Sequence, residues 1–175
     1  MANQEIPKLI IVSPCYNEEA ILRYSADTLT SFLKRVIALG KIAPSSRILY
    51  VNDGSRDRTW SLIEELHKDN SFVEGLSLAK NVGSELAVMA GMMAARERAD
   101  IVVTIDADLQ DDVEAIEEMI NHYLDGCDIV YGVKTSREAD PWLKRITAEG
   151  FYRLQQNMGI NVIFNHTNFR LMSKR

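Results

Sequence analysis

The chain has 175 residues, a formal net charge of −5, a hydrophobic content of 46% and a charged content of 26%. These values are typical of a single globular domain that can bury a core. The acidic balance, without a block of lysines or arginines, argues against a general nucleic-acid-binding protein. No apolar run approaches the ~20 residues that span a bilayer, and the first residues lack the pattern of a signal peptide. The two cysteines, Cys15 and Cys127, have no metal-binding or redox spacing, which favours reduced thiols and a cytoplasmic setting.

Strands and helices are predicted to alternate along most of the chain. Apolar, β-branched runs predict strands at residues 8–13, 47–52, 73–79, 101–105 and 128–133. Apolar residues at helical spacing predict helices at residues 18–39, 60–67 and 85–98, and the pattern Asp111-x-x-Glu114 predicts the start of a fourth helix. This alternation predicts an α/β fold with a mostly parallel, doubly wound sheet and helices on both faces.

Three details of these helices follow from the same patterns. Gly40 is expected at the end of the first helix, and Ser84 is a candidate N-cap of the third. The methionine cluster Met89, Met92 and Met93 is expected to lie in the core rather than to form a binding groove.

The pattern changes after Lys134. Residues 135–140 are predicted to form a polar loop, residues 142–158 an amphipathic helix and residues 162–172 an extended segment. The basic residues around Trp142 suit either a membrane interface or a core helix with exposed charged tips. Because no closing element follows the extended segment, we expect the chain to be a fragment of a longer protein.

A buried strand that ends in carboxylates is the most informative feature of the sequence. Residues 101–105 are apolar or β-branched and run directly into Asp106, Asp108 and Gln110. Charge at the carboxyl end of a parallel strand lies where open α/β sheets bind ligands. Oxygen ligands on alternate residues suit Mg²⁺ or Mn²⁺, which usually bind together with substrate phosphates. The sequence therefore predicts a metal-assisted reaction on a phosphate-containing donor.

Polar residues also follow the three earlier strands, at residues 14–18, 52–55 and 80–83. All four strand ends are expected at one edge of a parallel sheet. Together they offer an aromatic ring for stacking, carboxylates for a base edge or ribose, a cation for a diphosphate, and metal ligands. Those are the components of a nucleoside-diphosphate site. The absence of G-x-x-x-x-G-K-[ST], and of G-x-G-x-x-G after the first strand, counts against P-loop NTPases and dinucleotide-dependent dehydrogenases.

With these residues in place, the chain resembles family 2 glycosyltransferases of the GT-A fold. Within that family it is similar to the polyprenyl-phosphate branch, which holds dolichol-phosphate mannose synthases and bactoprenol glucosyltransferases. The matching segments, in chain order, are PCYNEE, VNDGSRDRT, LAKNVG, IDADLQDD, DIVYGVKTSRE, AEGFY and NFRLMSKR. The resemblance implies that residues 1–175 form one catalytic domain, without the C-terminal membrane helices that relatives often carry.

Candidate site residues follow from the resemblance by position. The nucleotide would be held by Pro14, Tyr16, Asn17, Glu18, Asp53, Gly54, Lys80 and Asp106. The metal and the diphosphate would be held by Asp106, Asp108 and Gln110. The acceptor phosphate would meet Lys134 and Arg145, and the catalytic group would comprise Asp108, Asn168 and Arg170.

The resemblance implies an inverting sugar transfer from a nucleotide-sugar, with a UDP-hexose expected before a GDP-sugar. The implied acceptor is a polyprenyl phosphate at the cytoplasmic face of the cell membrane. The attacking oxygen of such an acceptor is already anionic near neutral pH, so a strong general base is less necessary than for a sugar hydroxyl. The oligomeric state is left open, a homo-oligomer included.

Two positions depart from the pattern of the family. Asn168 stands where relatives usually carry an aspartate, and its amide can orient a group but cannot take a proton from it. Gly83-Ser84-Glu85 stands where relatives usually read Gly-His-Gln, and Glu85 adds negative charge near an anionic donor. Two alternatives therefore stay open: a nucleotide-sugar-binding domain without catalysis, or a transferase that acts on a glycan hydroxyl, against which Asn168 argues.

Overall fold

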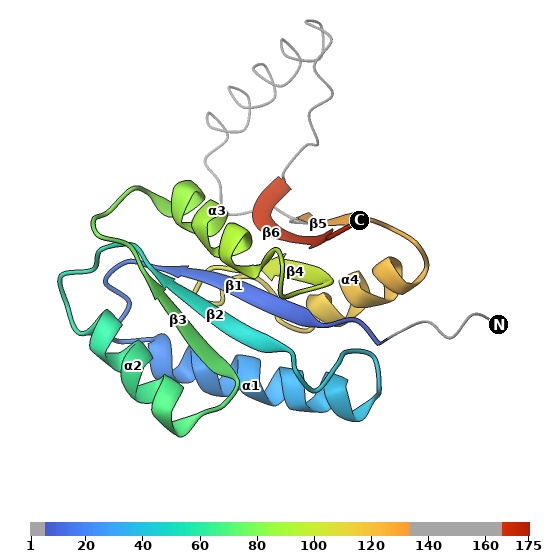
Figure 1. Ribbon diagram of the computed structural model, residues 1–175, viewed down its shortest axis with the longest axis horizontal. Coiled ribbons are helices and arrows are strands. Elements are labelled where there is room, and N and C mark those ends of the chain that lie inside the picture. The colour runs from blue at the N-terminus through green and yellow to red at the C-terminus, as the bar shows by residue number, and fades with distance from the viewer. Residues whose placement is uncertain (1–5, 134–165) are drawn as a thin grey trace, which may run out of the picture.

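A six-stranded sheet carries helices on both of its faces in the computed structural model, which describes residues 6–133 and 166–175 (Figure 1). The strands are β1 (Leu9–Cys15), β2 (Arg47–Asn52), β3 (Val73–Ser77), β4 (Ile101–Thr104), β5 (Ile129–Val133) and β6 (His166–Ser173). The helices are α1 (Leu22–Ala38), α2 (Thr59–Asp69), α3 (Ser84–Ala95) and α4 (Ala115–Leu124). The predicted α/β alternation is confirmed, and most bounds move by only a few residues.

The sheet has the strand order β3-β2-β1-β4-β6-β5. The four strands from β3 to β4 run parallel, whereas β6 is antiparallel to both β4 and β5. The mostly parallel sheet is therefore confirmed. In the register of the sheet, Val12 of β1 lies beside Thr104 of β4, and Cys15 lies beside Asn52 of β2. The carboxyl ends of β1, β2 and β4 consequently meet at one edge.

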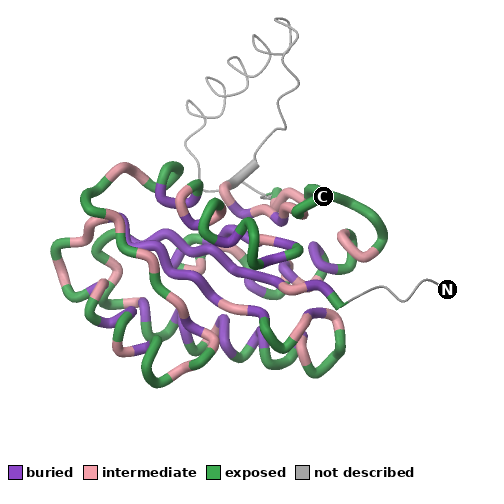
Figure 2. Tube along the Cα trace, in the orientation of Figure 1, coloured by how far each residue is buried: buried purple, intermediate pink, exposed green. Residues whose placement is uncertain are grey.

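Helices α1, α2 and α4 cover one face of the sheet, and α3 covers the other. Figure 2 shows the buried residues concentrated in the strands between these helix layers. On the α3 face, Gly91 lets the helix lie close to the sheet, because a Cβ there would meet Val12 at 2.5 Å and Val51 at 2.7 Å. The small residues of α3 thus permit the close packing that its Ala-rich composition suggests.

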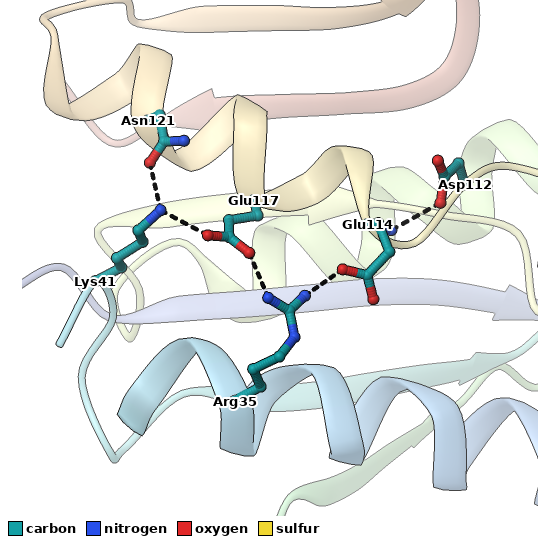
Figure 3. Close-up of polar contacts among 6 residues, drawn as sticks. All are labelled: Arg35, Lys41, Asp112, Glu114, Glu117 and Asn121. Carbon is teal, nitrogen blue, oxygen red and sulfur yellow. Dashed lines mark hydrogen bonds and ion pairs between the residues drawn. The ribbon is translucent and has the colours of Figure 1, made fainter. Parts of the chain in front are cut away.

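Charged side chains tie α4 to α1, as Figure 3 shows. Arg35 of α1 donates to the carboxylates of Glu114 and Glu117 at the start of α4. Lys41, which follows α1, donates to Glu117 Oε1 at 2.6 Å and to Asn121 Oδ1 at 2.9 Å. The hydrogen bonds from Lys41 and Arg35 lower the pKa of Glu117, so its carboxylate stays ionised. These contacts therefore fix the start of α4, where the connection from β4 ends, against α1.

The ends of the helices test the capping predictions. The chain leaves α1 at Gly40, which has φ +70°, and Lys41 N–H donates to the Val36 carbonyl at 3.2 Å, so the predicted end is confirmed. The prediction that Asp111 starts the fourth helix as its cap is wrong, because α4 begins at Ala115 and has no side-chain cap. It is Asp112 that accepts a hydrogen bond from a backbone N–H in this turn.

Helix α3 differs from expectation in two respects. Its N-cap position is held by Gly83, and Ser84 is already its first residue. The core assignment of the methionine cluster is wrong, because Met89 is 58% exposed and Met93 is 62% exposed. Leu86 on the same helix is also exposed. Because α3 is apolar on all sides, its sequence period does not reveal which side faces the sheet.

Several predictions concern residues outside the described ranges. These are the loop 135–140, the helix 142–158, and the acceptor-phosphate candidates Lys134 and Arg145. None of the described helices is both long and apolar enough to cross a bilayer.

Candidate active site at the carboxyl edge of the sheet

A pocket of about 320 Å³ opens where the strand ends meet. Six of the predicted site residues line it: Pro14, Tyr16, Glu18, Asp53, Asp106 and Asp108. Pro14 belongs to β1, and the other five follow β1, β2 or β4, three strands that lie far apart in sequence. The expectation that these strand ends share one edge is met by this geometry.

Asp53 joins two of the connections. Its side chain is buried, with 2% of the residue exposed, and it accepts hydrogen bonds from Val82 N–H at 2.7 Å and Gly83 N–H at 2.9 Å. These donors lie just before α3, where the backbone N–H groups of a helix favour negative charge. Each carboxylate oxygen keeps a further lone pair, so Asp53 can still accept a hydrogen bond from a ligand in the pocket.

Four predicted nucleotide or metal residues do not line the pocket. Asn17 accepts a hydrogen bond from Arg56 N–H at 2.9 Å, and therefore links two loops. Gly54 lies against the backbone of Lys80, whose side chain is exposed. Gln110 is also exposed, and its N–H donates to Asp108 Oδ1 at 3.2 Å.

Carboxylates give the pocket a strongly negative character. Burial raises the pKa of Glu18 above its ordinary value of 4.5, and the charges of Asp108, Asp57 and Asp106 raise it further. Asp106 and Asp108 themselves are exposed to the pocket. Excess negative charge of this kind favours a cation.

The donor set fits a hard divalent ion that shares its coordination with a ligand. Within residues 6–133 and 166–175, no group of three or more His, Cys, Asp or Glu side chains is placed to hold a metal ion alone. Mg²⁺ is commonly bound by only one or two carboxylates together with substrate phosphates. Asp106 and Asp108 match this arrangement, with the phosphates of a ligand completing the shell.

Cys15 also lines the pocket, as a small packing residue. Its thiol is buried and points to the Ser13 carbonyl at 3.6 Å. Burial raises the pKa of Cys15, and the negative charges of Glu18 and Asp106 raise it further. The thiol is therefore neutral and a poor nucleophile.

Two of the candidate catalytic residues lie on β6. Phe169 and Leu171 are buried in the core beside α1 and α4, so Asn168 and Arg170 point to the opposite face, because successive side chains alternate in a strand. Thr104 donates a hydrogen bond to the Asn168 carbonyl. Neither residue lines the pocket, and Arg170 Nε is buried without a hydrogen-bond partner among the described residues.

The sequence interpretation missed two groups near the pocket. Asn81 and Ser84 line it, and both belong to the LAKNVGSE stretch, in which only Lys80 is predicted to hold the nucleotide. Asp57 acts on the site electrostatically, although no role was given to it. An Asp two residues before a helix-starting Thr is a local turn signal that could have directed attention to Asp57.

Comparison with known proteins places the chain in a family. Residues 10–175 match the sequence profile of Glycosyl transferase family 2. The chain belongs to this family.

Two relatives illustrate the range of glycosyl transferase family 2 around this chain. The uncharacterized glycosyltransferase YkoT of Bacillus subtilis is 49% identical over 172 residues, which cover 98% of this chain and 51% of the relative. The bactoprenol glucosyl transferase of Shigella phage SfV is 36% identical over 169 residues, covering 95% and 52% respectively. This chain thus spans about half the length of the curated relatives it matches.

A solved structure shows the same fold. Glucosyl-3-phosphoglycerate synthase of Mycobacterium tuberculosis, in complex with Mn²⁺, UDP and glucosyl-3-phosphoglycerate, superposes with a TM-score of 0.62 at 18% identity. The match covers 96% of this chain and 57% of the synthase. The family 2 chain described here therefore has the GT-A fold.

Glu18 gives this family 2 domain a pH-dependent stability. Because the folded-state pKa of Glu18 is raised above its ordinary value of 4.5, its ionisation opposes folding. This penalty is absent below about pH 4, grows as the pH rises through the raised pKa, and is fully present at neutral pH. We expect Glu18→Gln, without divalent cations, to raise the melting temperature by about 1–2 °C at pH 7 and by nothing at pH 4. Scanning calorimetry at both pH values tests this, and an equal gain at both would contradict it.

Proposed function

We propose that this domain transfers a sugar from a nucleotide-sugar, most simply a UDP-hexose, to a polyprenyl phosphate at the cytoplasmic face of a membrane. The observation that carries the proposal is the convergence of Tyr16, Asp53, Asp106 and Asp108 on one pocket at the carboxyl edge of the sheet. The bactoprenol glucosyl transferase at 36% identity supports a lipid-linked acceptor. The family 2 fold supports a nucleotide-sugar donor.

The donor nucleotide would occupy the pocket between the β1 and β2 connections. Tyr16 is 41% exposed, and its ring offers an apolar face for stacking on a base. The free lone pairs of Asp53 can accept hydrogen bonds from a base edge or a ribose hydroxyl. Lys80, exposed beside Gly54, is the cation proposed for the diphosphate.

The implied metal fits the acidic side of the pocket. Asp106 and Asp108 would hold Mg²⁺ or Mn²⁺ with the diphosphate, and Gln110 could supply an amide oxygen. When bound, the ion neutralises the charge that grows on the departing nucleoside diphosphate. Both carboxylates follow the carboxyl end of β4, so a metal ion that they held would lie at this edge of the sheet.

The transfer itself is a single displacement. A phosphate oxygen of the acceptor forms a bond to the anomeric carbon as the bond from that carbon to the donor diphosphate breaks, which inverts the configuration. Since the attacking oxygen is already anionic, a strong general base is less necessary, and the amide of Asn168, which lies outside the donor pocket, would orient the acceptor by hydrogen bonds. Arg170, two residues further along β6, would supply a half-buried cation on the same face. Lys134 and Arg145 are the other proposed acceptor contacts.

The exposed side of α3 supports a lipid-linked acceptor. Ser84, the first residue of α3, lines the pocket, and Leu86, Met89 and Met93 continue from there as one exposed apolar stripe. A stripe beginning at the pocket offers an isoprenoid chain or a bilayer surface a contact next to the reacting phosphate.

Replacing Leu86, Met89 and Met93 together by serine is therefore expected to weaken binding to vesicles that contain phosphatidylglycerol by about tenfold, since apolar area is lost. Flotation measures this. The control is Tyr24→Ser, because Tyr24 is equally exposed but belongs to α1, on the other face. Unchanged flotation of the triple variant, or an equal loss in the control, would argue against this surface.

Calorimetric titration of UDP and GDP, each with and without Mn²⁺, tests the donor site directly. We expect one nucleotide to bind, and its dissociation constant to fall at least about tenfold when Mn²⁺ is present, because the ion joins the diphosphate to the two carboxylates. No binding of either nucleotide by the folded protein would end the proposal. Binding without any turnover, hydrolysis included, would instead favour a nucleotide-sugar-binding domain.

A further inference from the structure

Two loops beside the pocket are joined by hydrogen bonds that run in both directions. The donor loop comprises residues 16–19, after β1, and the clasp comprises residues 55–59, after β2. Asn17 N–H donates to Ser55 Oγ at 3.0 Å, and Asn17 Oδ1 accepts from a clasp N–H. Glu19 closes the pairing, since a carboxylate oxygen of Glu19 accepts from Arg58 N–H at 2.8 Å.

Thr59 lies at the centre of this pairing. It is fully buried, and its Oγ1 accepts from Glu18 N–H at 2.8 Å while donating to Asp57 Oδ1 at 2.6 Å. Asp57 Oδ2 in turn accepts from Glu19 N–H at 3.2 Å. A hydroxyl can accept one of these hydrogen bonds and donate the other through a single oxygen atom, which valine cannot do. Although burial opposes it, the hydrogen bonds from Thr59 and Glu19 lower the pKa of Asp57, so the carboxylate is available as an acceptor.

The donor loop makes a sharp turn at Asn17. This residue has φ +58°, a left-handed conformation that asparagine adopts more readily than most other residues that carry a side chain. Tyr16 and Glu18, on either side of it, line the pocket. The conformation of Asn17 therefore decides where both side chains point, while none of the clasp residues lines the pocket.

We propose that Thr59 and Asp57 are positioning residues for donor binding. They hold the donor loop in the conformation that presents Tyr16 and Glu18 to the nucleotide, without touching the nucleotide themselves. The inference rests on the proposed nucleotide-sugar site. The clasp makes the free energy of binding more favourable, because the donor loop is already ordered and no entropy is lost by ordering it when the donor binds.

The decisive variant is Thr59→Val, which keeps the shape of the side chain and removes both hydrogen bonds. We expect the dissociation constant of the preferred nucleotide to rise about tenfold, with or without Mn²⁺, because the loop must be ordered on binding. In turnover assays the donor KM should rise by a similar factor while kcat stays within about twofold. Thr59→Ser, which retains the hydroxyl, should restore the affinity to within about twofold of the wild type.

A matched control separates positioning from loss of stability. Thr30 is also a buried threonine, and its Oγ1 accepts from Asn70 Nδ2 at 2.8 Å, but it belongs to α1 and does not line the pocket. Thr30→Val should lower the melting temperature and leave nucleotide affinity unchanged. Asp57→Asn keeps an acceptor oxygen for Thr59 and should weaken binding by less than about threefold, whereas Asp57→Ala should match Thr59→Val.

The possible failures point to different errors. If the wild-type protein binds no nucleotide, the proposed function fails. If the wild type binds and Thr59→Val binds equally well, the positioning role fails while the proposed function stands. The positioning role also fails if Thr30→Val weakens binding as much as Thr59→Val, or if Thr59→Ser restores nothing.

Discussion

Replacing Gly54 by alanine is expected to destabilise the protein by about 3 kcal/mol and to lower its melting temperature by about 6–12 °C. A Cβ on Gly54 would lie 2.5 Å from both the Asn81 nitrogen and the Lys80 carbonyl carbon, and these are backbone atoms that cannot rotate away. The residue also has φ +63°, which disfavours any side chain. Thermal unfolding of Gly54→Ala measures the stability, and nucleotide titration should show weakened binding. The added Cβ would displace Lys80 and Asn81. These residues directly precede the two backbone N–H groups, of residues 82 and 83, that donate to the Asp53 carboxylate.

Gly40→Ala is the matched control for this prediction. Gly40 has a similar φ of +70°, but apart from its chain neighbours no residue has an atom within 4 Å of its hypothetical Cβ. We expect it to cost only about 1 kcal/mol, from backbone strain, and to leave nucleotide binding unchanged. The difference between the two variants isolates the close approach of the two loops. Equal destabilisation by both would show that the approach at Gly54 is unimportant.

The sequence predicts the fold well where the pattern of apolar and polar residues is compatible with only one type of element and one buried side. Residues 47–52 form a strand with the predicted bounds, because an apolar run is bounded by polar residues on both sides. Helix α3 is apolar on every side, so the exposure of Met89 and Met93 could not be deduced from their spacing. The antiparallel direction of β6 was likewise not predicted, since pairing direction depends on the path of the chain and not on local composition.

Some residues of the candidate site could likewise be predicted from the sequence, and others could not. The position of Asp106 and Asp108 in the pocket could be predicted because both follow a buried strand. Residues directly after the carboxyl end of a parallel strand lie where open α/β sheets bind ligands. Lys80 and Gln110 share similar surroundings in the sequence, yet neither lines the pocket. The role of Thr59 could not be deduced, because its hydrogen bond to Glu18 joins residues 41 positions apart. Contacts between loops arise from packing of the whole fold.

The isosteric change Asp108→Asn is expected to abolish the effect of Mn²⁺ on nucleotide affinity and to slow sugar transfer by about 10³-fold. The amide keeps the shape of the side chain but carries no charge for the ion. Nucleotide binding without metal should be unchanged or slightly tighter, because one of the negative charges in the pocket is lost. Parallel calorimetric titrations with and without Mn²⁺, together with a transfer assay on polyprenyl phosphate, measure both effects.

Glu118→Gln is the control for the loss of charge, because Glu118 is an exposed acidic residue of α4 that does not line the pocket. It should leave metal dependence and transfer unchanged. If Asp108→Asn still binds nucleotide in a metal-dependent way, the ion is held elsewhere and the proposed role of Asp108 is wrong. The charge of Asp108 also raises the pKa of Glu18, so Asp108→Asn should reduce the stabilisation that Glu18→Gln produces at pH 7. The carboxylate proposed to hold the metal thus opposes folding through Glu18 when no metal is bound, so we expect metal binding and stability to be linked through this pair of side chains.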